Sequence, residues 1–154
     1  MSLFIDRVRA PVYTCRKAVA VADLYHINFH TFQNKPIFLD VEYARAIDQI
    51  LFDVVERHSI LQLARAIMPT HVHCIIAAFP DQSRADIVQR LKGASAKVFL
   101  ERYPDVSMQL GGHLWQEGYD WVLITTHRQL RKTVAYIEAN RPKIGLPPLS
   151  EPLP

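Results

Sequence analysis

Two histidines stand two residues apart in the segment His71-Val72-His73. The residues around them are apolar and predict a β-strand over about 71–79, and side chains two apart on a strand project from the same face of its sheet. Each neutral imidazole offers a nitrogen lone pair, so the pair could form one edge of a divalent-metal site. Most His-x-His pairs on strands bind nothing, so these two residues predict a site only together with further chemistry.

Further chemistry is predicted on the last helix. Its apolar stripe consists of Leu130, Val134 and Ile137, which recur at helical spacing. Tyr136 and Asn140 lie one turn apart on a different side, so a phenol and an amide stand next to each other. A tyrosine at the margin of the core and an ordinary helix-ending asparagine would explain the same pattern without a function.

Together the two groups acquire a chemical logic. A tyrosine hydroxyl with a pKa of about 10 is a poor nucleophile at neutral pH, so attack on a phosphodiester needs a divalent ion to neutralise the phosphate. Two imidazole nitrogens and one amide oxygen leave coordination positions open for that phosphate and for water. Transfer to tyrosine keeps the bond energy in a covalent intermediate, so no nucleotide cofactor is required.

The elements that must position these residues follow from hydrophobic patterning and helix caps. Strands are predicted at about 24–32, 60–68, 71–79 and 114–125. Helices are predicted from Asp40, from Ser83 to about Arg102, and from Thr126 to near Asn140, before Pro142. The order βαββαβ is that of a ferredoxin-like antiparallel sheet with helices on one face. We therefore predict the α+β class, with an additional C-terminal helix that carries Tyr136.

Composition predicts one globular domain inside the cell. The chain has 154 residues, of which 49% are hydrophobic and 21% charged, and a formal net charge of +3 that permits nucleic-acid binding without proving it. Cys15 and Cys74 are too far apart in sequence for a thiolate zinc motif and fit a reducing compartment. Charged residues near the start and the lack of a long apolar run predict no signal peptide, no membrane partner and a cytoplasmic location.

Three motifs, in order between Tyr25 and Leu146, resemble those of the single-tyrosine HUH transposases. They are Met-Pro-Thr-His-Val-His-Cys-Ile-Ile at 68–76, Leu-Trp-Gln-Glu-Gly-Tyr-Asp at 114–120 and Tyr-Ile-Glu-Ala-Asn-Arg-Pro-Lys-Ile-Gly-Leu at 136–146. Asparagine four residues after the tyrosine is similar to the REP-associated tyrosine transposases, whereas the insertion-sequence branch usually has glutamine there. The chain departs from the pattern at Arg141, inserted before Pro142, and at Asp120, where a second aromatic residue is usual.

This resemblance implies that His71, His73 and Asn140 bind Mg²⁺ or Mn²⁺ and that Tyr136 is the nucleophile. The implied reaction is cleavage of single-stranded DNA near hairpin or palindromic ends, which leaves a 5′-phosphotyrosine and a free 3′-hydroxyl. Attack by a 3′-hydroxyl then rejoins the strands. One branch is typically a homodimer and the other resembles a monomer, so both states stay open. The implied organisation is an N-terminal extension at 1–23, a transposase domain at 24–146 and a Pro-rich tail at 147–154.

Other polar and aromatic residues have weaker patterns. His26 and His30 share a face of the first predicted strand, where they could approach the site or the DNA, or be ordinary half-buried strand residues. His113 and Glu117 flank the fourth strand and could bind metal, although exposed loop residues explain them better. Candidate phosphate contacts are Arg84, Arg90, Lys92, Lys97, Arg128, Arg131, Lys132 and Lys143, and candidate base-stacking residues are Trp115, Tyr119 and Trp121.

Three other functions remain open at this point. A replication-initiator-like or domesticated nickase would share the chemistry but not its biological outcome. A catalytically silent module would use the sheet and its aromatic residues to hold single-stranded nucleic acid. A zinc hydrolase built on His71 and His73 is disfavoured, since no further His, Asp or Glu stands at a convincing spacing.

Overall fold

A four-stranded antiparallel sheet forms the centre of the protein, and its strand order is β4-β5-β3-β6. The computed structural model describes residues 14–15, 18–19, 21–147 and 149. The strands are β3 (Asp23–His30), β4 (Leu61–Ile67), β5 (His71–Ala78) and β6 (Asp120–Ile124), and β1 (Thr14–Cys15) and β2 (Ala18–Val19) form a separate pair. The helices are α2 (Val41–Arg57), α3 (Arg84–Arg102), α4 (Pro104–Gln109) and α5 (His127–Lys143), with 3-10 turns η1 (Phe32–Asn34) and η2 (Ile37–Leu39).

The predicted βαββαβ order and the α+β class are confirmed. The helix α2 joins β3 to β4, and α3 with the short α4 joins β5 to β6. All three predicted caps are present, since side-chain oxygens of Asp40, Ser83 and Thr126 accept backbone N–H groups at the starts of α2, α3 and α5. The predicted hairpin is also present, with Pro69 and Thr70 between β4 and β5.

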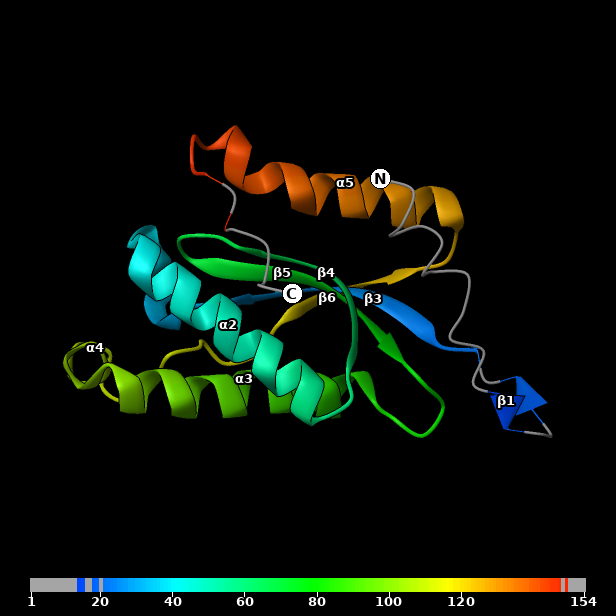
Figure 1. Cartoon of the computed structure of the whole chain (residues 1–154), viewed down its shortest axis with the longest axis horizontal. Helices are drawn as coiled ribbons and strands as arrows, with labels where there is room; N and C mark the ends of the chain where they lie inside the picture. Colours follow the sequence, from blue (N-terminus) through cyan, green and yellow to red (C-terminus); the bar gives the residue numbers. More distant parts are fainter. Residues whose placement is uncertain (1–13, 16–17, 20, 148, 150–154) are drawn as a thin grey trace.

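Helices cover both faces of the sheet. Figure 1 shows α2 and α3 on one side and α5 on the other. Along β5, Val72, Cys74 and Ile76 belong to the large core cluster that includes residues of α2 and α3, whereas Ile75 packs in a smaller cluster with Leu130 and other residues beneath α5. Strand alternation therefore directs His71 and His73 to the α5 side. Within the described residues, no helix combines the length and the apolar character that crossing a membrane requires.

The fourth strand is shorter than predicted. The strand expected at about 114–125 is reduced to β6, and Trp115 forms an isolated bridge with Thr31 before it. Gly118 has a φ of +76° and turns the chain between these two segments. Lys92 fixes this turn from α3, because its Nζ donates to the backbone oxygens of Gln116 and Gly118 at 2.7 and 2.6 Å.

The last helix runs past the predicted end near Asn140. Pro142 lies inside α5, which reaches Lys143 even though proline normally ends a helix. The final turn closes on Arg141, whose backbone oxygen accepts from the backbone N–H of Leu146 at 3.0 Å. The buried Arg141 side chain also donates to the backbone oxygens of Ile67 and Pro147, at 2.7 and 2.8 Å, so it fastens the helix end to β4.

Candidate active site

Five polar side chains gather on the α5 side of the two central strands. His26, Asn28 and His30 alternate along β3, and the antiparallel register sets Asn28 opposite His73 and His30 opposite His71. Paired residues of neighbouring strands share a face, so these side chains form one polar patch. The predicted projection of both β5 histidines from one face follows from this register.

The two β5 histidines face each other through their Nε2 atoms, which are 3.0 Å apart. Each Nδ1 atom has its own partner: Thr70 Oγ1 is 2.9 Å from the Nδ1 of His71, and His26 Nε2 is 3.1 Å from the Nδ1 of His73. Two ligands at about 2.1 Å from one octahedral cation and at right angles to each other are about 3.0 Å apart. The pair therefore has the spacing and the donor type that a divalent ion requires.

Burial keeps these imidazoles neutral. Burial, with a smaller contribution from the positive charge that His71, His26 and His30 carry when protonated, lowers the pKa of His73 to about 3. Burial also lowers the pKa of His71 and His26 below the usual range, with a smaller contribution from His30 in the case of His71. A neutral imidazole keeps its lone pair, so the cluster is ready to bind a cation at neutral pH.

The same burial makes stability depend on pH. Between about pH 6.5 and pH 3 an unfolded His73 binds a proton that the folded protein does not, so stability is complete above pH 6.5 and is lost as the pH falls. We expect the free energy of unfolding of EDTA-treated protein to fall by about 2 kcal/mol for His73 alone between pH 7 and pH 5. Urea unfolding should show this loss in the wild type and a flatter dependence in His73→Gln. An equal dependence of the free energy of unfolding on pH in the two proteins would contradict the lowered pKa of His73.

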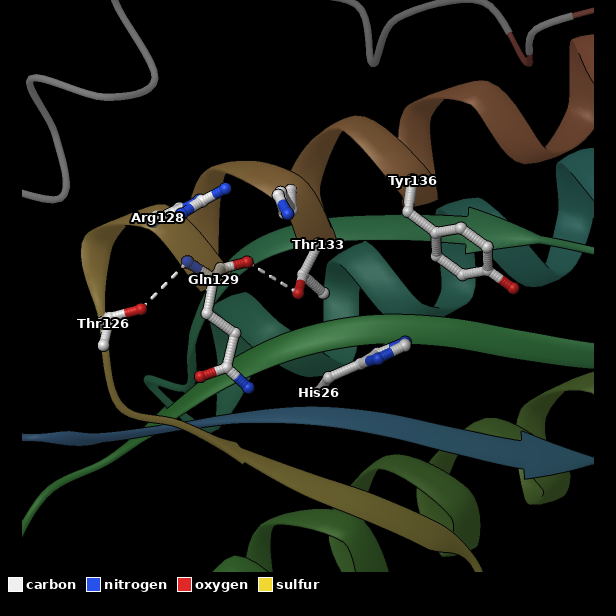
Figure 2. A pocket seen from close by; sticks show the side chains of 7 residues that line it. His26, Thr126, Arg128, Gln129, Thr133 and Tyr136 are labelled. Atoms are coloured by element: carbon white, nitrogen blue, oxygen red, sulfur yellow. Dashed lines mark hydrogen bonds between the residues drawn. The ribbon is translucent and has the colours of Figure 1, made fainter.

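Tyr136 lies directly above the histidines. Its ring centroid is 5.5 Å from that of His73 and 6.2 Å from that of His26, both edge-on, and 45% of the residue is exposed. Figure 2 shows the tyrosine ring descending from α5 towards the sheet, on the side where His26 stands. The Nζ of Lys143 lies 5.6 Å from the centre of the tyrosine ring. The fold thus brings together the predicted nucleophile on α5 and the predicted metal edge on β5, which are far apart in sequence.

Asn140 follows one turn later and is 7% exposed. The next residue, Arg141, donates a hydrogen bond to the backbone oxygen of Ile67 on β4. Ile67 pairs with Val72 on β5, and Val72 stands between the two histidines. Asn140 is therefore held over the same end of the sheet as His71. Its amide nitrogen is buried without a hydrogen-bond partner among the described residues.

Several other candidates lie away from the histidines or have structural partners. The ring of His113 packs on Phe32, and Glu117 is exposed in the turn before β6. Among the described residues, no group of three or more His, Cys, Asp or Glu could hold a metal. The three aromatic candidates contact residues of α3: Trp115 donates to Ser95 at 3.0 Å, Arg84 donates to Tyr119 at 3.3 Å, and the Arg84 guanidinium lies 3.5 Å from the centre of the Trp121 ring.

Sequence reasoning gave no role to Asn28 and Thr70. Asn28 Oδ1 and the Nδ1 of its neighbour His30 are buried without hydrogen-bond partners among the described residues, within the polar patch. The position of Asn28 could have been predicted, because side chains at 26, 28 and 30 of a strand share one face, which places the asparagine between two histidines. The contact of Thr70 with His71 depends on the turn, whose geometry the motif does not specify.

Three comparisons agree on the kind of protein. The family model "Transposase IS200 like" matches residues 21–140. The ISDra2 transposase TnpA of Deinococcus radiodurans is 34% identical over 105 residues, which are 66% of this chain and 73% of that protein. A crystal structure of a candidate transposase from D. radiodurans R1 is similar, with a TM-score of 0.63, 28% identity and coverage of 77% of this chain and 90% of that one.

A REP-associated tyrosine transposase bound to a REP hairpin has the same fold, with a TM-score of 0.61, 18% identity and coverage of 84% of this chain and 73% of that one. Fold and matches together define the class, which is that of DNA transposases. The chain belongs to the IS200-like transposase family.

Proposed function

We propose that this transposase is a metal-dependent endonuclease and strand transferase that cleaves single-stranded DNA through a 5′-phosphotyrosine at Tyr136. The observation that carries the proposal is the contact of the Tyr136 ring with His73, whose Nε2 lies 3.0 Å from that of His71. A nucleophile next to a two-nitrogen metal edge is the minimum that metal-assisted attack on a phosphodiester needs.

His71, His73 and Asn140 would hold the cation. The amide of Asn140 supports its inclusion, because its buried Nδ2 has no hydrogen-bond partner among the described residues, at a cost of about 1–3 kcal/mol, and in the reversed orientation a bound ion would instead be met by the amide oxygen. Rotation of the amide by 180° exchanges its nitrogen and oxygen, so the oxygen can occupy the buried position. A bound Mg²⁺ or Mn²⁺ would neutralise the charge of the phosphate and orient its oxygens.

In the proposed step the Tyr136 hydroxyl attacks the phosphorus and gives up its proton. The new bond joins the tyrosine oxygen to phosphorus, and the bond from phosphorus to the 3′-oxygen breaks. The 3′-oxygen leaves and takes up a proton, so one phosphodiester replaces another and no external energy source is consumed. Attack of a 3′-hydroxyl on the phosphotyrosine reverses the step and joins the strands.

A cleft of about 590 Å³ next to Tyr136 offers a path for the DNA strand. It lies between the first half of α5 and β3, and Figure 2 shows its lining side chains. Arg128 and Lys132 form no ion pair with another described residue, so both cations are available to phosphates. The cleft is lined by His26, Thr126, Arg128, Gln129, Lys132, Thr133 and Tyr136.

The expected partner is single-stranded DNA with a hairpin or palindromic end. The REP-associated transposase of the same fold binds a REP hairpin, which supports a hairpin as the probe for this chain. A homodimer remains a proposal, as does an active site shared between two copies.

The cleft cations should set part of the salt dependence of DNA binding. Each phosphate contact to single-stranded DNA contributes about 0.7 to the slope of log affinity against log salt. We expect Arg128→Gln combined with Lys132→Gln to lower that slope by about 1.4, measured by fluorescence anisotropy with a labelled oligonucleotide. The matched control is Arg45→Gln with Arg57→Gln, which removes the same charge from exposed positions on α2, across the sheet. Equal slopes for both double variants would mean that the strand does not use this cleft.

The proposed function is tested by trapping the covalent intermediate. Wild-type protein is incubated with hairpin-bearing single-stranded DNA, labelled on either side of the cleavage position, and Mn²⁺. We expect a denaturation-resistant adduct on the 5′-phosphate side and a released strand with a free 3′-hydroxyl. Binding without any adduct across a broad panel of hairpins would favour the silent nucleic-acid-binding module instead.

A further inference from the structure

A third histidine, His26, completes a chain of ring contacts around the two β5 histidines. Its Nε2 is 3.1 Å from the Nδ1 of His73, while the Nε2 of His73 is 3.0 Å from that of His71. His71 in turn has Thr70 Oγ1 at 2.9 Å from its Nδ1. The order Thr70, His71, His73, His26 is therefore an unbroken line of hydrogen-bonding atoms from the turn to β3.

The protons in this line can be placed in two ways. In the first, His73 donates from Nδ1 to His26 and keeps a lone pair on Nε2, where a metal can bind. In the second, His26 donates to the Nδ1 of His73, so the proton of His73 lies on Nε2 and blocks the metal. The proton on the ring nitrogen away from the metal decides which arrangement exists.

The two β5 histidines differ in which tautomers their partners allow. The Thr70 hydroxyl can donate or accept, so His71 can take either tautomer by rotation of that hydroxyl. His73 is 6% exposed, and apart from the His71 contact at Nε2 its ring has one hydrogen-bonding partner among the described residues, His26. A buried N–H without an acceptor is costly, so the tautomer of His73 depends on residue 26.

We propose that His26 is a positioning residue that accepts the Nδ1 proton of His73 and so directs the His73 Nε2 lone pair to the metal. The proposal rests on the metal site of the proposed function. His26 itself is not one of the proposed metal ligands, because its Nε2 contacts the Nδ1 of His73, whereas the proposed metal lies at the Nε2 atoms of His71 and His73. Its ring also meets that of Tyr136 edge-on, so the same side chain forms one wall beside the nucleophile.

Two substitutions separate hydrogen bonding from packing. His26→Gln can present an amide oxygen near the place of Nε2, whereas His26→Leu fills the space without an acceptor. His58→Leu removes a histidine at the end of α2, away from the site, and is the control. Mn²⁺ affinity is measured by calorimetry without DNA, and the His73 tautomer by long-range ¹H–¹⁵N NMR of metal-free protein.

We expect His26→Leu to weaken Mn²⁺ binding by about 10- to 100-fold and to move the His73 proton from Nδ1 to Nε2. His26→Gln should stay within about threefold of the wild type and keep the Nδ1 proton. Unchanged affinity and tautomer in His26→Leu would overturn the proposal, as would equal losses in both variants with a lower melting temperature. If the tautomer responds as expected but wild-type protein binds no Mn²⁺, the metal site of the proposed function fails while the role of His26 in fixing the tautomer stands.

Discussion

Tyr136→Phe is expected to abolish both the covalent adduct and strand cleavage, with a fall in rate on the order of 10⁴-fold or more. The substitution removes only the hydroxyl oxygen that would form the new bond to phosphorus. Phenylalanine keeps the ring that packs edge-on against His73 and His26, so the surrounding geometry should persist. Hairpin affinity should stay within about threefold of the wild type, because phosphate contacts elsewhere dominate binding.

Tyr103→Phe is the matched control, since it removes a tyrosine hydroxyl that bonds Glu42 on the α2 side of the sheet. It should cleave at the wild-type rate. The measurement is a single-turnover assay on a labelled hairpin, resolved on a denaturing gel. An adduct that persists in Tyr136→Phe would transfer the role of nucleophile to another residue.

His71→Ala is expected to abolish cleavage and to weaken Mn²⁺ binding by more than about 100-fold, while hairpin binding is nearly intact. The expected loss of Mn²⁺ affinity exceeds the roughly 10- to 100-fold that is typical when a residue hydrogen-bonded to a metal ligand is removed, because here one of the ligands itself is removed. His71 is half-buried at the start of β5, and its ring stacks on that of His30, with centroids 5.1 Å apart. Its removal therefore leaves the main apolar core, on the other face of the sheet, unchanged.

His113→Ala provides the control for loss of an imidazole, because its ring contacts only Phe32 among the aromatic side chains of the described residues. Calorimetry with Mn²⁺ and a gel-shift assay with the hairpin separate metal binding from DNA binding. Equal loss of both in His71→Ala would assign this histidine to structure or DNA binding instead of catalysis.

Much of the fold could be predicted because short-range rules act at each element. Caps at Asp40, Ser83 and Thr126 mark the three long helices, and alternation along 71–79 separates residues facing the core from those facing α5. The proximity of Tyr136 to His73 is of another kind. It depends on how α5 crosses the sheet, so it was predicted from the motifs of a family and not from periodicity.

The wrong predictions concern places where one side chain overrides local preference. The pattern around Trp115 predicts a strand, yet the backbone forms a turn in which the oxygens of Gln116 and Gly118 accept hydrogen bonds from Lys92. Likewise, Pro142 predicts an early helix end, but the buried Arg141 holds another turn against β4. Both interactions join segments far apart in sequence, which local patterning does not contain.

The attachment of α5 has a consequence for how the protein fails. This helix contributes only Leu130 and Ile137 to the buried residues of its cluster, and Arg141 fastens its end, whereas α2 and α3 rest on the large core. Release of α5 would expose only the smaller of the two apolar clusters and leave the large core, and with it the histidine-bearing sheet, folded. Loss of activity is therefore expected to precede loss of fold. Warming or mild denaturant should inactivate the protein, because α5 moves the tyrosine away from the histidines before the sheet and the large core unfold.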